Sequence, residues 1–395
     1  MEPEEIVRVA AKGEGVTESG RHVAFTAPGD RVGEDGSVKP GPHRAIPPCR
    51  HFGRCGGCQL QHLDEAALAA FVQGRVRNAA LSQGLEPQVL APVHLSPPRS
   101  RRRATLHASG GKSRAAIGFR EAGAHRIVDM AECHILRPEL FAIVAPLRAM
   151  LAIQTGNWST DVDLALTDQG VDCGIRNFRM EGLEATEAAM AFARVQSLAR
   201  LTVDLGYGPE TIWEPEPVTV RLGGIPVPFP PGGFLQATAD GEQALSQAAR
   251  EWTMGSPVVA DLFSGLGTFA FALGGRVAAF EAARDAHLAC RAAASRANRQ
   301  VDAFHRDLFR NPLRPDELAN FDAVVLDPPR AGARDQVAQI ASSAVGRVVY
   351  VSCNPASWAR DARTLADAGF HLAELRPVGQ FRWSTHVELA SLFVR

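Results

Sequence analysis

The sequence of 395 residues contains no apolar run long enough to cross a bilayer and no recognisable secretory or transit segment. It also contains no internal repeat and no low-complexity tract. The net charge is only -1, so the overall charge gives no indication of nucleic-acid binding. These absences exclude membrane-spanning and repeat architectures, and they predict a protein of the cytoplasm. Because 46% of the residues are hydrophobic, the chain can bury a large core, and its length predicts two or three domains.

Cysteine is scarce, with seven residues, yet three of the seven lie within ten positions of one another. These are Cys49, Cys55 and Cys58, in a loop that also contains several glycines. In a reducing cytoplasm, clustered cysteines bind metal more often than they form disulfides. A structural zinc site usually has two close cysteine pairs, and only Cys55 and Cys58 form one. From spacing alone, the fourth ligand can be either Cys133 or Cys173.

The carboxyl-terminal half predicts an α/β fold that binds a nucleotide-like cofactor. The apolar strand Val258–Leu262 runs into a turn with Gly265 and Gly267, where a dinucleotide or S-adenosylmethionine can lie against bare backbone. A second strand at 276–280 ends at Glu281, where such folds place the acid that accepts hydrogen bonds from ribose hydroxyls. From about residue 236 onward, strands and helices alternate regularly, which is typical of a parallel sheet covered by helices.

Two later strands end in residues that are suited to chemistry. The run 321–326 leads into Asp327-Pro328-Pro329-Arg330, and the run 349–351 leads into Ser352-Cys353-Asn354-Pro355. A strand can hold a thiolate at its carboxyl end, pointing into the crevice where a cofactor lies. Amino-group methyltransferases place an aromatic residue after the two prolines, and RNA cytosine-5 methyltransferases place a cysteine directly after the Asp-Pro. Neither pattern is present here, and Cys353 is the one cysteine at a strand end in this half.

With Glu388 opening a final apolar strand, the motif set resembles that of the RNA 5-methyluridine methyltransferases. The resemblance extends from Phe234-Leu235-Gln236 to the end of the chain, and the segment 49–59 looks like the iron–sulfur segment of that family. It implies a class I S-adenosylmethionine-dependent, Rossmann-like α/β domain at the carboxyl terminus. It also implies that Cys353 is the nucleophile and Glu388 the proton acceptor. Six positions are implied to surround S-adenosylmethionine: Gln236, Phe263, Thr268, Glu281, Asp307 and Asp327.

The same resemblance implies a 4Fe-4S cluster near the amino terminus. It selects Cys133 as the fourth ligand, beside Cys49, Cys55 and Cys58. By this comparison the cluster is structural or positions RNA, and it takes no part in methyl transfer. We therefore expect the remaining cysteines outside the active site to be core residues.

The chemistry of uracil explains why these residue types are needed. Carbon 5 of uracil is too poor a nucleophile to take a methyl group directly from a sulfonium, but a thiolate that adds to carbon 6 makes carbon 5 nucleophilic. After methyl transfer, a general base must remove the carbon 5 hydrogen so that the thiolate can leave. We expect burial to raise the pKa of Glu388 into a useful range. We also expect the helix that begins after Pro355, or a nearby cation, to lower the pKa of Cys353.

The sequence predicts three regions. Residues 1–48 are expected to form a short β unit, interpreted as an abbreviated RNA-binding barrel, 49–230 an iron–sulfur and RNA-binding region, and 231–395 the catalytic domain. Between 99 and 128, eight arginines and lysines face one acid. We expect this stretch, which includes Arg101, Arg102, Arg103 and Lys112, to contact phosphates.

The predicted function is methylation of carbon 5 of a uridine in RNA, and 23S rRNA is the expected substrate. Cluster-bearing relatives that modify transfer RNA leave the T-loop uridine of tRNA as an alternative. A catalytically idle RNA-binding or folding factor is a second alternative, which the presence of both Cys353 and Glu388 disfavours. The target base must leave its stack to reach Cys353, so a loop or unfolded RNA segment is expected. We expect the protein to act as a monomer with RNA as its partner.

Overall fold

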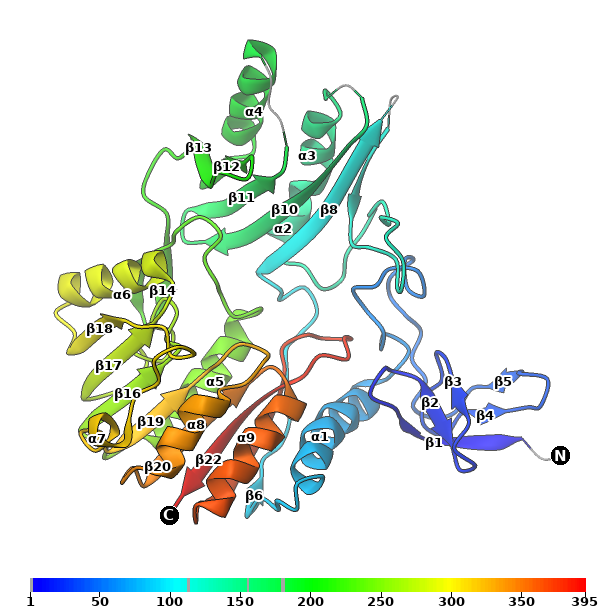
Figure 1. The fold of residues 1–395 in the computed structure, drawn as a ribbon. Helices are drawn as coiled ribbons and strands as arrows, with labels where there is room; N and C mark the ends of the chain where they lie inside the picture. Colours follow the sequence, from blue (N-terminus) through cyan, green and yellow to red (C-terminus); the bar gives the residue numbers. More distant parts are fainter. Residues whose placement is uncertain (1–2, 112–113, 155, 179–181) are drawn as a thin grey trace.

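The computed structural model describes residues 3–111, 114–154, 156–178 and 182–395, so Lys112 of the basic stretch lies outside the described residues. Figure 1 shows three sheet-containing parts, with the amino-terminal β unit at one side of the molecule. Its five short strands follow the order β3-β2-β1-β4-β5. They are β1 (Glu4–Val9), β2 (Gly15–Thr17), β3 (His22–Val23), β4 (Arg31–Val32) and β5 (Val38–Lys39).

A six-stranded sheet forms the central part, with the order β13-β12-β11-β10-β8-β9. Along β8 the side chains alternate, because successive residues of a strand point to opposite faces. Ala104 and Leu106 are buried, whereas Thr105 between them is exposed. Three helices cover the apolar face, and the polar face is turned toward the carboxyl-terminal part (Figure 1). The elements are β8 (Arg103–Gly111), β9 (Arg114–Gly118), β10 (Trp158–Thr167), β11 (Gly170–Arg176), β12 (Arg200–Asp204), β13 (Pro209–Trp213), α2 (Pro138–Ala142), α3 (Val144–Leu151) and α4 (Leu183–Val195).

The carboxyl-terminal part is built on a larger sheet with the order β18-β17-β16-β19-β20-β22-β21-β6. Its first five strands are parallel, and β22 runs antiparallel between β20 and β21. The inner parallel strands β19 and β20 are buried along nearly their whole length, as expected where helices cover both faces of a sheet. The strands are β16 (Val258–Leu262), β17 (Arg276–Glu281), β18 (Val301–His305), β19 (Ala323–Leu326), β20 (Arg347–Ser352), β21 (His371–Gly379) and β22 (Glu388–Val394). The helices are α5 (Ala239–Trp252), α6 (Arg284–Arg296), α7 (Pro315–Leu318), α8 (Arg334–Ala341) and α9 (Pro355–Asp367).

The carboxyl-terminal part also recruits an earlier piece of chain. Helix α1 (Glu65–Leu81) packs on α9 and β21, and β6 (Val89–Leu90) and β7 (His94–Leu95) pair in parallel with β21. The predicted region 49–230 is therefore not one structural unit, because residues 65–95 add to the sheet of the other half. A small hairpin of β14 (Thr219–Leu222) and β15 (Ile225–Pro228) leads back into that half.

Among the described residues, no helix is both long and apolar enough to cross a membrane.

Candidate active site

A cavity of about 690 Å³ lies at the carboxyl ends of the parallel strands. All six residues predicted to surround S-adenosylmethionine line this cavity, and so do Cys353 and Glu388. The reason is topological, because Phe263, Glu281 and Cys353 stand at or just after the ends of parallel strands that finish at the same edge of the sheet. Glu388 reaches that edge from the opposite direction, because it is the first residue of the antiparallel strand β22. The structure thus brings all eight predicted residues together.

The turn after β16 forms one wall of the cavity. Phe263 has a φ of 62°, a strained value for a residue with a side chain, and its ring lies 5.3 Å from that of Phe309. Gly267, at a φ of 93°, has no room for a side chain, since a Cβ there would lie 2.7 Å from the Phe271 ring. The backbone nitrogen of Gly265 donates to Glu281 at 2.8 Å, so the second-strand carboxylate holds the turn in place.

A chain of hydrogen bonds joins two buried carboxylates of the cavity, those of Asp327 and Glu388. Gln236 Nε2 donates to Asp327 Oδ2 at 3.0 Å, and Gln380 Nε2 donates both to Gln236 Oε1, at 2.9 Å, and to Glu388 Oε2. The Gln380 carbonyl oxygen accepts from the Thr238 backbone nitrogen at 3.2 Å, so its amide is fixed in one orientation. Sequence reasoning missed Gln380, because a single glutamine after a strand carries no motif.

Burial sets the acidity of the three reactive groups. It raises the pKa of Asp327 to about 7, against a hydrogen bond from Gln236 that lowers it. Burial and the charge of Asp327 raise the pKa of Glu388 to about 8, which is the direction that a general base requires. Our prediction that the pKa of the Cys353 thiol is lowered was wrong. Burial, followed by the charges of Glu388 and Asp327, raises the pKa of Cys353 to about 11, and the opposing charge of Arg330 does not compensate. Helix α9 does begin at Pro355, as expected.

The four cysteines predicted to bind a cluster line a common cavity, which apolar residues such as Phe119 complete. Burial raises the pKa of all four thiols, that of Cys58 to about 12. The charges of neighbouring thiolates add to the shift at Cys55, Cys58 and Cys133, and the charge of Glu132 adds to it at Cys49. Within the part of the chain that the structure describes, no group of three or more His, Cys, Asp or Glu side chains is arranged to hold a metal ion. Cys173 is fully buried in the central core.

Three arginines of the basic stretch, Arg101, Arg102 and Arg103, do not form an ordinary solvated face, whereas Arg126 is exposed. Arg102 forms a largely buried ion pair with Glu242, so its charge is already compensated. The guanidinium of Arg101 lies 5.7 Å from the centre of the Phe381 ring, and that of Arg103 lies 4.3 Å from the centre of the Phe234 ring. Arg102 is therefore a structural residue. Arg103 contacts Phe234, which lines the active-site cavity, whereas Arg101 lines a smaller cavity together with Phe381 and Gln380.

The strand order, the glycine turn and the thiol facing a buried carboxylate define an S-adenosylmethionine-dependent α/β methyltransferase. The sequence profile of the tRNA (Uracil-5-)-methyltransferase family matches residues 292–395. A 23S rRNA (uracil(1939)-C(5))-methyltransferase of Chromohalobacter salexigens is 33% identical, with 90% of this chain and 77% of the relative covered. An uncharacterized RNA methyltransferase of Zymomonas mobilis is 48% identical over 99% of both chains. This chain therefore belongs to the RNA uracil-5-methyltransferase family and is an S-adenosylmethionine-dependent enzyme.

A solved structure agrees with this fold along the whole chain. The tRNA (uracil-54, C5)-methyltransferase of Pyrococcus abyssi, in complex with S-adenosyl-L-homocysteine, aligns over 99% of each chain with a TM-score of 0.76. At 23% identity, this similarity bears on the fold alone.

Proposed function

We propose that the protein methylates carbon 5 of one uridine in 23S rRNA through a covalent adduct with Cys353. The observation that carries this proposal is the single cavity that Cys353 and Glu388 share with the six predicted cofactor residues. The ribosomal target is supported by the 33% identical relative, whose name states that substrate. The match to a tRNA family profile keeps tRNA as the alternative substrate.

In this mechanism the Cys353 sulfur bonds to carbon 6 of uracil, and the electron pair of the 5,6 double bond makes carbon 5 nucleophilic. S-adenosylmethionine, when bound, supplies the methyl group that carbon 5 takes. Glu388 then accepts the remaining hydrogen of carbon 5 as a proton, the double bond forms again, and the carbon–sulfur bond breaks to return the thiolate. Gln380 holds the carboxylate of Glu388 in place for this step through its Nε2 donor.

Cofactor binding is assigned to residues around the turn after β16. Glu281 stands at the end of β17, where this kind of fold binds ribose hydroxyls. Phe263 and Phe309 offer aromatic faces for a purine ring, and Gln236 and Asp327 line the same cavity as the thiol. Thr268 and Asp307 also line this cavity.

The four amino-terminal cysteines are better explained as ligands of an iron–sulfur cluster than as thiols without a metal. Four buried thiols that lie close together repel one another once they are ionised. Bound iron compensates these negative charges and removes the repulsion. A single ion requires thiolates drawn tightly around one centre, whereas a 4Fe-4S cluster binds each thiolate to a different iron. Cys49, Cys55, Cys58 and Cys133 would hold it. The segment that holds these cysteines is joined to the loop between Gln380 and Glu388, because Gln59 and Leu60 both donate backbone hydrogen bonds to the carbonyl oxygen of Trp383.

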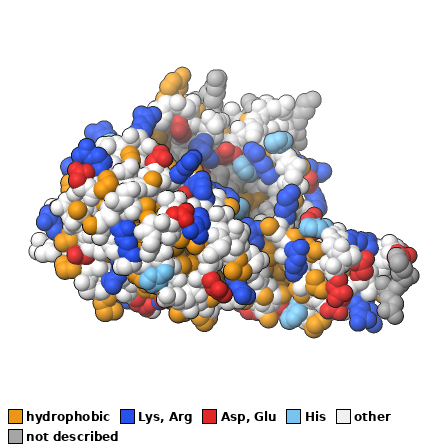
Figure 2. Space-filling view, turned by 60° about the horizontal axis from the view of Figure 1, so that its bottom comes forward, with side chains coloured by type: hydrophobic (Ala, Val, Ile, Leu, Met, Phe, Trp, Pro, Cys, Tyr) orange, Lys and Arg blue, Asp and Glu red, His pale blue; other side chains and the backbone are white. Residues whose placement is uncertain are grey.

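Positive charge around His386 supports RNA binding, and one of the arginines that supply it, Arg330, lines the active-site cavity. In the described structure, no carboxylate forms an ion pair with Arg75, Arg101 or Arg330. Arg330 contacts His386 at 3.4 Å, and burial together with the charges of these three arginines lowers the pKa of His386. Figure 2 shows Lys and Arg side chains around the hollow in the middle of this face. Uncompensated arginines of this kind suit RNA phosphates.

The test is to map 5-methyluridine in the RNA of cells that have or lack this protein, and to repeat the reaction with purified enzyme and labelled S-adenosylmethionine. We expect one uridine of 23S rRNA to lose its methyl group without the protein and to regain it in the purified reaction. Label in tRNA alone would favour the T-loop alternative. Absence of label from all RNA would overturn the proposed function.

A further inference from the structure

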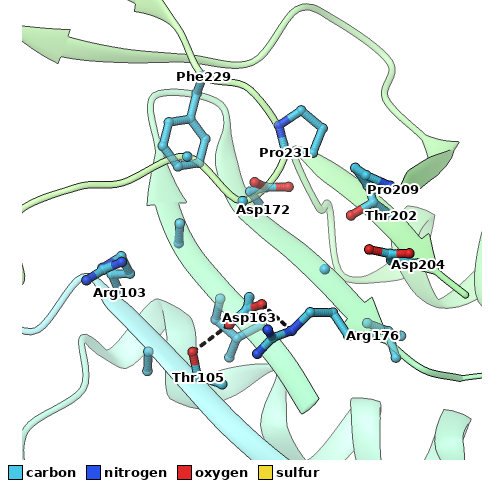
Figure 3. Close-up of a pocket in the computed structure, with 17 residues that line it drawn as sticks. Arg103, Thr105, Asp163, Asp172, Arg176, Thr202, Asp204, Pro209, Phe229 and Pro231 are labelled. Carbon is cyan, nitrogen blue, oxygen red and sulfur yellow. Dashed lines mark hydrogen bonds and ion pairs between the residues drawn. The ribbon is translucent and has the colours of Figure 1, made fainter. Parts of the chain in front are cut away.

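A second cavity, of about 240 Å³, lies between the polar face of the central sheet and the loop 229–233 (Figure 3). Pro231, Gly232 and Gly233 line both this cavity and the active-site cavity, so one stretch of loop separates the two. Sites that enclose a whole drug-sized ligand have roughly 300–1,000 Å³. The smaller size of this cavity suits a single ring system.

Four adjacent strands provide the floor of this cavity. One row of directly paired residues crosses them, and paired residues place their side chains on the same face of a sheet. The row runs from β8 through β10 and β11 to β12 and consists of Thr105, Asp163, Gly174 and Thr202. The middle of the floor is therefore bare backbone, with polar side chains on either side of it.

Gly174 is not needed for the backbone conformation, because it is absent from the glycines with positive φ. A Cβ at this position would point to Thr202 Oγ1 at 3.2 Å and to Asp163 Cβ at 4.0 Å. Glycine weakens a strand interior, and it often marks a place where a ligand approaches the backbone closely. The space that Gly174 leaves open would accept a flat ring lying on the sheet.

The polar lining of this space contains the carboxylates of Asp163, Asp172 and Asp204 and the guanidinium groups of Arg103 and Arg176. Asp172 is paired with Arg200, which leaves Asp163 and Asp204 as the acceptors considered for a ligand. Asp163 accepts from Thr105 Oγ1 and from Arg176 Nε at 2.9 Å, and Asp204 accepts from the backbone nitrogen of Gly206 at 2.6 Å. Each carboxylate has about four lone-pair sites, so both keep acceptor capacity. Carboxylates accept from the exocyclic amino groups of bases and repel the carbonyl oxygens of uracil. Phe229 forms the facing wall of the cavity (Figure 3).

We propose that this cavity binds a second nucleobase of the RNA substrate, one that carries an exocyclic amino group and lies close to the target uridine in the strand. The proposal rests on the proposed function, since the first base would occupy the neighbouring cavity. Asp163 would accept from the amino group, and the ring would lie over Gly174. Arg103, which lines this cavity and stacks on Phe234 of the other, would neutralise a phosphate between the two nucleotides.

The experiment measures binding of four short fluorescent RNAs by anisotropy, with S-adenosylhomocysteine present. Each RNA has a central uridine, and the nucleotides on both sides of it are all adenosine, all cytidine, all guanosine or all uridine. We expect wild type to bind at least one of the first three roughly fivefold to hundredfold more tightly than the uridine-only RNA, the range of one good base contact. Gly174→Val fills the cavity and should abolish this preference, whereas the matched control Gly174→Ala should keep most of it. Asp163→Asn replaces an acceptor with a donor and should shift the preference toward uridine.

Gly174→Val should bind S-adenosylhomocysteine with wild-type affinity, because the active-site cavity lies on the other side of the loop. If Gly174→Val loses affinity for S-adenosylhomocysteine, the base preference of Asp163→Asn becomes the test of the proposal. Equal affinity of wild type for all four RNAs, or a full preference in Gly174→Val or Asp163→Asn, would overturn the proposal. Failure of uridine methylation would appear separately, as absence of methyl label in RNA, because the base preference is measured by binding alone.

Discussion

Glu388→Gln should trap the enzyme on its methylated substrate. Glutamine has nearly the shape of glutamate, and its carbonyl oxygen can accept the hydrogen bond that Gln380 Nε2 donates to Glu388. The substitution therefore removes the base and its charge while the side chain keeps its position. Because a neutral amide is a poor proton acceptor, the adduct should form and then fail to break down.

The size of the effect follows from the charges in the cavity. General-base catalysis contributes roughly a hundredfold to ten-thousandfold, which corresponds to about 3–5 kcal/mol on the barrier for release. The attack by Cys353 should not slow, because the charge of Glu388 is the largest cause, after burial, of the raised pKa of this thiol. Formation of the adduct is thus preserved or favoured, and its breakdown is slowed by two to four orders of magnitude.

The assay is denaturing electrophoresis after incubation with RNA and S-adenosylmethionine that carries a labelled methyl group. Glu388→Gln should give a labelled protein–RNA band, and the double variant with Cys353→Ala should give none. Slow turnover without a labelled band would show that Glu388 does not remove the proton, and that it only orients the base or stabilises the start of β22.

Three further outcomes are expected. Cys353→Ala should retain S-adenosylmethionine binding, measured by calorimetry, and should have less than about a hundredth of wild-type turnover, since the thiol attacks the base; higher turnover would exclude the covalent route. Because the pKa of Glu388 rises from 4.5 to about 8 on folding, the ionised form is disfavoured in the folded state, so wild-type stability should fall between pH 4.5 and 8. Glu388→Gln should therefore melt above wild type at pH 8 and close to it at pH 5, and an equal difference at both pH values would contradict the shift. Cys58→Ser should lose the iron of anaerobically purified protein, which metal analysis would measure, whereas Cys173→Ser should keep it; stoichiometric zinc in wild type would refute the cluster.

The active-site residues could be predicted from sequence because the fold repeats one geometric rule. In a parallel sheet, the residues that follow each strand meet at one edge. Residues predicted to follow the strands can therefore be predicted to share one site. Glu281, Asp327 and Cys353 were found in this way, whereas Phe263 was implied by the family resemblance, and the structure places all four around one cavity. Glu388 follows the same rule in reverse, because the first residue of an antiparallel neighbour lies at that edge.

Features that depend on pairing across long sequence distances could not be predicted. The pairing of β6 and β7 with β21 joins residues almost 300 positions apart, and strands of two residues carry too little pattern to reveal it. The ion pair of Arg102 with Glu242 likewise spans 140 positions, so this arginine looked like a free cation in the sequence. The pKa of Cys353 depends on how far burial and two carboxylates outweigh one arginine, which composition and spacing do not specify.

The hydrogen-bond chain through Gln236 and Gln380 links two buried carboxylates, Asp327 and Glu388, to which the proposed mechanism assigns different functions. Each carboxylate receives its own amide donor, which stabilises the ionised form and opposes the effect of burial. Without Gln380, burial and the charge of Asp327 would act on Glu388 with less opposition, and its pKa would rise further above neutrality. A general base works best with a pKa near the operating pH. The amide of Gln380 therefore does more than fix a rotamer, because its hydrogen bond opposes the rise of the Glu388 pKa above about 8. In the proposed mechanism, a carboxylate with this pKa would accept the carbon 5 proton and lose it again to solvent.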